Sequence, residues 1–510
     1  MLSLRRIYCH STSNLFTYLI MSKNQSIYAG LQPAEVWRHF AALNDIPRLS
    51  KHEAAAREYV QRVAGECGAA FQTDDYGNIV VRVNASSQGL QNASTVAFQS
   101  HLDMVCQHLP DVAFDPLRDS IKVHREGDRI YADGTTLGAD NGIGASVMLA
   151  LLTSSDVEHG PLELLFTVEE EIGLIGAMKL DPALVKARTM INLDSTSTTE
   201  VTVGCAGGEG VDISLNLNRQ PSEKLHCYQI DISGLQGGHS GVQIDEPRAN
   251  AIKLLAKVLL QLHENVNWHL CNFRGGSAHN AIPRDASATI AIAAQDATRL
   301  EELIAAEAKR LKQDWEKDEP GLQLKVLLAK DCESTFDADS SAAAIELLNE
   351  LPHGVQKMSG RFEGKVETSC NLSNVEIDGN QLKLHVSSRS LVDAELDKLQ
   401  ANVLQIGLAA GAEAQRTEGY PGWEPRAESK LAEVASRALR KVNGTEPQVE
   451  VIHAGVECGV IASKIDDLDV ISIGAELYAL HSPEECVVIP SVEIIWNAVK
   501  DILAEYSNAA

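Results

Sequence analysis

The chain has 510 residues, which is too long for a single compact core, so two or more domains are expected. Its hydrophobic fraction of 44% and charged fraction of 22% are typical of ordinary globular proteins. The formal net charge of −26 argues against a nucleic-acid-binding surface, because phosphate recognition requires clustered Lys and Arg. The ten cysteines occur singly, which predicts reduced thiols, and no apolar stretch reaches the ~18 residues that a membrane span requires.

The N-terminal segment differs in composition from the rest of the chain. Residues 1–25 contain three basic residues and several serines, and no acidic residue occurs before Glu35. This composition is typical of an organellar transit peptide. Met21 offers a second start, so an over-extended start at Met1 is an equal interpretation. We exclude residues 1–25 from the predicted fold under both interpretations.

Residues 26–206 are expected to form the first part of an α/β domain. Two helical patterns, at 33–43 and 52–68, precede short apolar runs and one strongly helical segment, GIGASVMLALLTSS. The order strand, helix, strand predicts βαβ units and a sheet that is at least partly parallel. The predicted strands are GNIVVRV, STVAFQS, LELLFTV and TMINLDS.

The pattern changes near residue 205. A β-α-β-α order follows, and then a turn-bounded hairpin, NVEIDGN, continues into LKLHVSSRS and another helix. We interpret residues 207–418 as an inserted α+β domain, which could consist of two related halves. The first pattern resumes over 419–510, so these residues are expected to complete the first domain.

Residues that can bind metals follow four of the predicted strands. His101, three consecutive glutamates, Asp194 and His481 each follow a strand, and Asp140 precedes a glycine-rich helix start. Because binding sites form at the carboxyl edge of open parallel sheets, these side chains are expected to converge. Nitrogen and oxygen ligands suit zinc, with manganese or cobalt as alternatives.

Five ligands exceed the number that one tetrahedral zinc ion requires. With one bridging carboxylate they suffice for two ions about 3.5–4 Å apart, as in co-catalytic hydrolase sites. Asp103 lies two residues after His101 on an extended segment, so it can accept the proton of the imidazole nitrogen that does not bind metal. Each residue alone is more often a polar loop residue, and the glutamates alone are more often a solvated surface. The spacing alone leaves both interpretations open.

The chain resembles a known family from about residue 30 to its end. The matching motifs, in order, are SHLDMV, GTTLGADNGIG, TVEEEIGLIGA, NLDS, VGCAGG, GLQGGHSG, NAIPR, GYPGWEP, HAGVECG and HSPEE. They are similar to those of the aminoacyl-histidine dipeptidases, also called Xaa-His or cytosol non-specific dipeptidases, within the di-zinc peptidases that include carboxypeptidase G and aminoacylase. The resemblance implies an α/β catalytic domain with a mixed, mostly parallel sheet and an inserted α+β lid domain.

The resemblance also implies a role for each candidate ligand. His101 would bind one ion, with Asp103 orienting its ring as part of the catalytic machinery, and Asp140 would bridge both ions. Asp194 would complete the first ion's ligands. The second ion would be bound by Glu171 and His481.

Two of the three consecutive glutamates match the family motif. Glu170 would be the general base that takes a proton from the attacking water and passes it to the leaving amine. Glu171 would be the metal ligand. Glu169 replaces a residue that is commonly neutral in the family, which leaves a register ambiguity of one position, and we interpret it as a solvated bystander.

The inserted domain would supply substrate contacts. His239 in GGHSG resembles the family histidine that stabilises the developing oxyanion. Asn280 and Arg389 match residues expected to hold the free carboxylate of the substrate. The alternatives are a turn histidine, a capping asparagine and a surface arginine. His279 receives no role.

The resemblance predicts metal-dependent hydrolysis of a broad range of dipeptides, including Xaa-His dipeptides such as β-alanyl-histidine. The expected cofactors are two divalent ions, zinc with cobalt or manganese as alternatives. A di-zinc deacylase of N-acyl amino acids is the alternative enzyme, whereas a non-catalytic relative would require loss of a ligand or the base. The expected partners are dipeptides, with no nucleic acid and no membrane, and a homodimer is one expected assembly. The expected location is cytoplasmic, or organellar if residues 1–25 act as a targeting signal.

Overall fold

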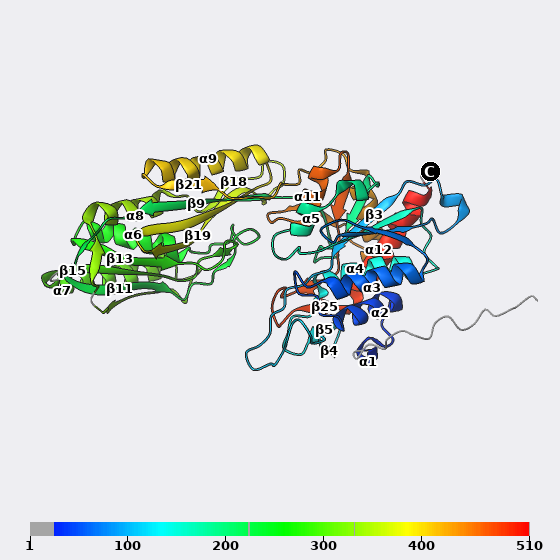
Figure 1. Ribbon diagram of the computed structural model, residues 1–510, viewed down its shortest axis with the longest axis horizontal. Helices are drawn as coiled ribbons and strands as arrows, with labels where there is room; N and C mark the ends of the chain where they lie inside the picture. Colours follow the sequence, from blue (N-terminus) through cyan, green and yellow to red (C-terminus); the bar gives the residue numbers. More distant parts are fainter. Residues whose placement is uncertain (1–24, 223–224, 331, 509–510) are drawn as a thin grey trace, which may run out of the picture.

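The computed structural model describes residues 25–508 apart from 223, 224 and 331. The segment interpreted as a leader, residues 1–25, lies outside the described residues except for Gln25. The described chain forms two domains that lie side by side (Figure 1). Both the N-terminal segments, in blue and cyan, and the C-terminal segments, in orange and red, belong to one domain, and the green and yellow middle of the chain forms the other.

The first domain is built on an eight-stranded mixed sheet. β3 pairs in parallel with β6 and β7, β7 with β23, and β8 with β22, whereas β1, β2 and β6 pair antiparallel. The strands are, in spatial order, β1 (Ala70–Thr73), β2 (Ile79–Val83), β6 (Leu162–Thr167), β3 (Val96–His101), β7 (Thr189–Asn192), β23 (Asp469–Ser472), β8 (Glu200–Cys205) and β22 (Gln448–Ile452).

Helices cover both faces of this sheet. Because strand side chains alternate between faces, Val96 and Phe98 of β3 join one buried cluster and Ala97 joins another. The larger cluster includes residues of α1 (Gln25–Tyr28), α2 (Ala34–Asn44), α3 (Ala54–Glu66), α4 (Ala139–Thr153), α10 (Lys430–Asn443) and α12 (Ile489–Asn508). The smaller includes residues of α5 (Ile175–Lys179) and α11 (Glu457–Lys464).

A small antiparallel sheet lies next to this core. It connects the segment before α4 with the segment before α12, which are far apart in the sequence. Its strands are β24 (Leu477–Tyr478), β25 (Cys486–Val488), β5 (Arg129–Ala132) and β4 (Val123–Glu126). The loop between β24 and β25 carries His481.

The second domain, which we call the lid, has two layers. Its nine-stranded antiparallel sheet contains β16 (Gln323–Leu328), β11 (Leu225–Ser233), β15 (Ala286–Ala293), β13 (Trp268–Gly275), β19 (Val366–Asp378), β20 (Gln381–Ser390), β9 (Gly207–Asn216) and β21 (Glu413–Arg416), with β18 (Gly354–Met358) paired to β19. The main buried cluster of the lid lies between this sheet and helices α6 (Ala251–His263), α7 (Ala297–Asp314), α8 (Ala338–Glu350) and α9 (Asp393–Ala409).

Two short ribbons extend from the lid sheet. β12 (Gly238–His239) pairs with β14 (Ala281–Ile282), and β10 (Arg219–Pro221) pairs with β17 (Ser334–Phe336). The predicted fold class is confirmed, because a mixed α/β domain carries an α+β insertion. The predicted domain boundaries at 206/207 and 418/419 stay a prediction. Within residues 25–508, no helix has the length and hydropathy to cross a membrane.

Candidate metal centre

The predicted ligands lie together at one edge of the eight-stranded sheet. β3 ends at His101, the chain after β6 carries Glu170 and Glu171, and Asp194 follows β7. Since these three strands are parallel neighbours, their carboxyl ends place the side chains at the same edge. Asp140 at the start of α4 and His481 in the β24–β25 loop approach from other elements.

One half of the cluster contains His101, Asp140 and Asp194. Nε2 of His101 lies 3.1 Å from Oδ1 of Asp140 and 3.4 Å from Oδ1 of Asp194. The three ligand atoms all lie within 4.8 Å of one another. His101 is 1% exposed, so this half of the cluster is buried.

The other half contains Glu171, His481 and the second oxygen of Asp140. Nε2 of His481 lies 2.9 Å from Oε2 of Glu171 and 3.4 Å from Oδ2 of Asp140. Asp140 therefore offers one carboxylate oxygen to each half, which is the arrangement expected of a bridging ligand. His481 is half exposed, whereas the Glu171 side chain is buried, so solvent reaches this half of the cluster mainly at His481.

The residues fit a pair of divalent cations. Two ligands of a tetrahedral zinc ion, each at about 2.0–2.1 Å, lie about 3.4 Å apart, and the four distances above are 2.9 to 3.4 Å. Oε1 of Glu171 is buried without a hydrogen-bond partner. A buried carboxylate oxygen with no partner is costly unless a cation neutralises it.

The pKa shifts of the clustered side chains also indicate a site for cations. Burial raises the pKa values of Glu170, Glu171 and Asp194, and neighbouring carboxylates raise them further. Burial alone would also raise the pKa of Asp140, but hydrogen bonds with the two histidines lower it below its ordinary value. The bonds to Asp140 and Glu171 raise the pKa of His481 to about 11. Without cations these groups share protons, which divalent ions would displace.

Asp103 connects His101 to the glutamates. The Nδ1–H of His101 donates to the carbonyl oxygen of Asp103 at 3.1 Å, and Oδ1 of Asp103 lies 3.4 Å from the same nitrogen. The Asp103 carboxylate also accepts hydrogen bonds from the backbone N–H groups of Glu170 and Glu171, at 3.0 and 3.2 Å, and from the hydroxyl of Ser50. This arrangement leaves Nε2 of His101 available for a metal ion.

Glu169 has surroundings different from those of its two neighbours. Its carboxylate accepts a hydrogen bond from the hydroxyl of Tyr76 at 2.9 Å. The groups of ligand atoms within 4.8 Å of one another include Glu170 and Glu171 but not Glu169, among the residues that the structure describes. The geometry therefore favours the register in which the last two glutamates belong to the site.

Two buried charged residues near the site have no role in the sequence analysis. The Glu485 carboxylate accepts four backbone N–H groups at the start of α4, from Leu137 to Asp140, at 2.8 to 3.2 Å. Arg48 is 1% exposed and donates to the carbonyl oxygens of Leu102, Asp103 and Gly138. Glu485 lies in the HSPEE motif, which could have indicated it, whereas no sequence signal marks Arg48.

A third missed residue, Glu457, lies behind the cluster. It is fully buried at the start of α11, and Oε2 accepts hydrogen bonds from Gln99 and Thr167 at 2.6 and 2.7 Å. Burial raises its pKa to about 8. Because Gln99 and Thr167 belong to β3 and β6, these contacts connect α11 to the strands that end at the metal ligands.

His239 lies on the lid ribbon formed by β12 and β14. Its Nδ1 accepts hydrogen bonds from the backbone N–H groups of Gly241 and Val242, both at 3.1 Å. Burial, together with the charges of Arg389 and His481, lowers the pKa of His239 to about 4. The ring is therefore neutral, with its proton on Nε2, and can act as a hydrogen-bond donor.

The other two predicted substrate residues belong to the same part of the lid. Arg389 on β20 is 8% exposed; it donates to the hydroxyl of Tyr420, and its Nε is buried without a partner. Asn280 is exposed, and its backbone carbonyl oxygen accepts a hydrogen bond from the N–H of Ser240, next to His239. An open groove of about 1080 Å³ on the lid is lined by His239 and Asn280 but not by Arg389. His279 still receives no role.

Two family models match successive parts of the chain. The model described as Peptidase family M28 matches residues 78–228. This range includes all the predicted ligands except His481. The model described as Peptidase dimerisation domain matches residues 230–319, within the lid.

Relatives match nearly the whole chain. The cytosol non-specific dipeptidase of Escherichia coli (strain K12) is 37% identical over 476 residues, covering 93% of this chain and 98% of the relative. The crystal structure of aminoacylhistidine dipeptidase from Vibrio alginolyticus is 34% identical and has a TM-score of 0.81, covering 94% of this chain and 98% of the other. The aminopeptidase PepT of Bacillus cereus ATCC 10987, at 18% identity and a TM-score of 0.53, shares the fold. The chain therefore belongs to the cytosol non-specific dipeptidase family of peptide-bond hydrolases.

Proposed function

We propose that this protein hydrolyses dipeptides of broad composition, including Xaa-His dipeptides such as β-alanyl-histidine, at a centre of two divalent cations. The observation that carries the proposal is the position of Asp140, whose two carboxylate oxygens each lie near one histidine of the cluster. The names of the Escherichia coli and Vibrio relatives support the substrate class.

The proposed ligands divide into two sets around Asp140. His101 and Asp194 bind one cation, and Glu171 and His481 bind the other. The cations, when bound, lower the pKa of a water to roughly 7 and polarise the peptide carbonyl. We favour zinc because the ligands are imidazole nitrogens and carboxylate oxygens, with cobalt or manganese as alternatives.

Glu170 is the proposed general base. Its backbone N–H donates to the Asp103 carboxylate, and a ligand atom of its side chain lies within 4.8 Å of ligand atoms of His101 and Glu171. In this role Glu170 takes the proton of the attacking water and delivers it to the leaving amine.

Lid residues are the proposed substrate contacts. The Nε2–H of neutral His239 donates to the oxygen of the substrate carbonyl as negative charge develops on it. Arg389, whose buried Nε lacks a partner, binds the terminal carboxylate together with Asn280. A clamp on this carboxylate restricts hydrolysis to short substrates.

We further propose a homodimer formed through the lid and a cytoplasmic location. The match of residues 230–319 to the dimerisation-domain model supports the first, and the name of the Escherichia coli relative supports the second. Analytical ultracentrifugation of the full chain tests the assembly, and a monomer at all concentrations would contradict it.

A substrate panel on metal-stripped enzyme tests the function. The enzyme is supplied again with zinc, cobalt or manganese and assayed with dipeptides, tripeptides and N-acetyl amino acids. We expect no turnover without a cation and highest kcat/KM on dipeptides. Faster turnover of N-acetyl amino acids would identify a deacylase instead, and full activity in the stripped enzyme would refute the metal mechanism.

A further inference from the structure

Three cysteines converge on the lid sheet, on the face opposite the helices. Cys227 is on β11 and Cys271 is on β13, and β15 runs between these strands. Ala291 of β15 lies opposite Cys227 in the register, and its methyl group joins the two cysteines in a small buried cluster separate from the main lid core. The small side chain of Ala291 leaves room for the two thiols to approach each other over the middle strand.

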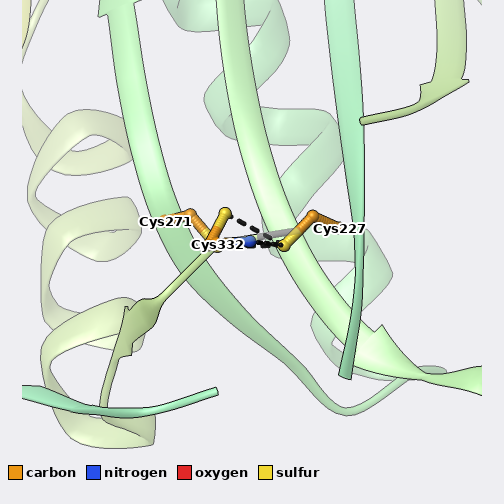
Figure 2. A group of neighbouring side chains, drawn as sticks. All are labelled: Cys227, Cys271 and Cys332. Atoms are coloured by element: carbon orange, nitrogen blue, oxygen red, sulfur yellow. Dashed lines mark hydrogen bonds between the residues drawn. The ribbon is translucent and has the colours of Figure 1, made fainter. Parts of the chain in front are cut away.

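The sulfur atoms are close enough to share one ligand. The Sγ atoms of Cys227 and Cys271 are 3.9 Å apart, and the Sγ atom of Cys332 lies 2.9 Å from that of Cys227. All three lie within 4.8 Å of one another (Figure 2). Cys271 is the extra residue of a β-bulge between Leu270 and Asn272, and such bulges redirect a side chain.

Ala329 and Cys332, which follow β16 in the chain, pack against this group. The backbone N–H of Cys332 donates to Sγ of Cys227 at 3.1 Å, and the N–H of Ala329 donates to the carbonyl oxygen of Cys227 at 2.8 Å. Figure 2 shows Cys332 and its N–H in contact with Cys227. A backbone N–H directed at sulfur stabilises a thiolate more than a neutral thiol.

We propose that Cys227, Cys271 and Cys332 bind one thiophilic d10 cation, Zn²⁺ or Cu⁺, through three thiolates. Three sulfur atoms at about 2.3 Å from one cation lie about 4 Å apart, both in a trigonal arrangement around Cu⁺ and in a tetrahedral arrangement around Zn²⁺ with a water as the fourth ligand. The Cys227–Cys271 distance already matches this value, and Cys332 on its loop needs to move outward by about 1 Å to match it. Soft thiolate ligands select these cations over Mg²⁺ and Ca²⁺.

Binding involves loss of protons and no transfer of electrons. Burial raises the pKa of the Cys271 thiol, so this thiol is protonated when no cation is present. Each coordinating thiol releases its proton to solvent as its sulfur–metal bond forms. Cys227 and Cys271 are 1% and 8% exposed, so a bound cation would be shielded from water on the side of the sheet.

The expected role is structural, because the cysteines belong to the lid and the catalytic ligands belong to the other domain. A cation at this position would connect β11, β13 and the β16–β17 connection. A cation that binds the folded lid more tightly than the unfolded chain would stabilise the lid, and the stabilisation would rise with the logarithm of the cation concentration above the dissociation constant.

The test compares cation binding by cysteine variants of the full chain under anaerobic, reducing conditions. Wild type, Cys227→Ser and Cys332→Ser are stripped of metal and titrated separately with Zn²⁺ and with Cu⁺ against a chromophoric chelator. Cys370→Ser is the matched control, since Cys370 is a lid cysteine on β19 that is also 1% exposed. Cys332 is only partly buried, so its variant keeps the test valid if Cys227→Ser does not fold.

We expect wild type and Cys370→Ser to bind one equivalent more than Cys227→Ser and Cys332→Ser for at least one of the two cations. With Cu⁺, wild type and Cys370→Ser should also show a thiolate-to-metal charge-transfer band, which Cys227→Ser and Cys332→Ser should lack. Turnover with the catalytic ions restored should be the same in Cys332→Ser and wild type. Equal stoichiometry in all four proteins would overturn the proposal, as would a Cys227–Cys332 disulfide in the freshly isolated, unreduced protein.

Discussion

Replacement of Glu170 by Gln separates the proposed chemistry from metal binding. The side chain keeps its shape but loses the ability to accept and return a proton. Burial, together with the charges of Glu171 and Asp194, already raises the pKa of Glu170. Removing one negative charge from this cluster therefore costs the cation-free protein no electrostatic stability, and the five proposed ligands stay in place.

The expected loss of activity follows from the role of a general base. Positioned bases contribute roughly 10²–10⁴-fold to rate, and each tenfold step corresponds to about 1.4 kcal/mol of activation free energy. Glu170→Gln should thus lower kcat by two to four orders of magnitude, or about 3–5 kcal/mol. Because the water nucleophile and the lid contacts are retained, KM should change much less than kcat.

The assay combines steady-state kinetics on a dipeptide with metal analysis of the same sample. Glu169→Gln is the matched control, since the neighbouring residue loses the same charge while its amide oxygen can still accept from Tyr76. We expect the control to keep wild-type turnover. Residual turnover above one-tenth in Glu170→Gln, or a loss of bound metal in that variant, would refute the assignment of the base.

Three further predictions concern the lid, the start of α4 and acid stability. His239→Ala should lower kcat by about 10²–10³-fold with little change in KM, as expected for an oxyanion donor; an effect on KM alone would indicate simple binding. Glu485→Gln leaves some of four buried N–H groups without an acceptor, so thermal unfolding should show a loss of about 1–3 kcal/mol together with weaker metal retention. Burial lowers the pKa of His453 to about 3 in the folded protein. Below the ordinary pKa of 6.5 this histidine is therefore protonated only in the unfolded chain, and the folded state loses stability as the pH decreases. Between pH 7 and 5, metal-stripped His453→Gln should lose about 2 kcal/mol less stability to denaturant than metal-stripped wild type, and an equal loss would contradict this.

The predicted ligands converge because their positions depend on strand ends, which hydrophobic patterns reveal. His101, Asp194 and the glutamates follow apolar runs that form β3, β7 and β6, and parallel pairing brings these ends to one edge. Spacing alone could not select Asp140 as the residue between the two histidines. The motif resemblance is what indicated Asp140 as the bridging residue. The contact of Glu169 with Tyr76 favours Glu170 and Glu171, and not Glu169, as the glutamates of the site.

Contacts between distant segments could not be read from the sequence. The Glu485 carboxylate accepts hydrogen bonds from backbone N–H groups at the start of α4, 345 to 348 residues earlier in the chain. Every residue except proline has a backbone N–H, so the sequence at the donor residues does not reveal this contact. The cysteines appeared to be isolated because Cys227 is 44 and 105 residues from its two neighbours. Antiparallel pairing across β15, a bulge and a loop bring them together, and none of these features follows from local periodicity.

The backbone around the proposed metal centre contains several strained residues that a bound cation would help to hold in place. Four of the six non-glycine residues with left-handed φ in the described chain lie close in sequence to the ligands: Glu169, Leu174, Ala479 and His481. Such conformations cost about 1–3 kcal/mol each and persist only where surrounding contacts hold them. Hydrogen bonds to Asp103 hold the backbone at Glu170 and Glu171, but the cluster itself contains buried carboxylates that repel one another. Divalent cations bound by the proposed ligands would convert this repulsion into attraction, so they would stabilise the strained loops that position the proposed base.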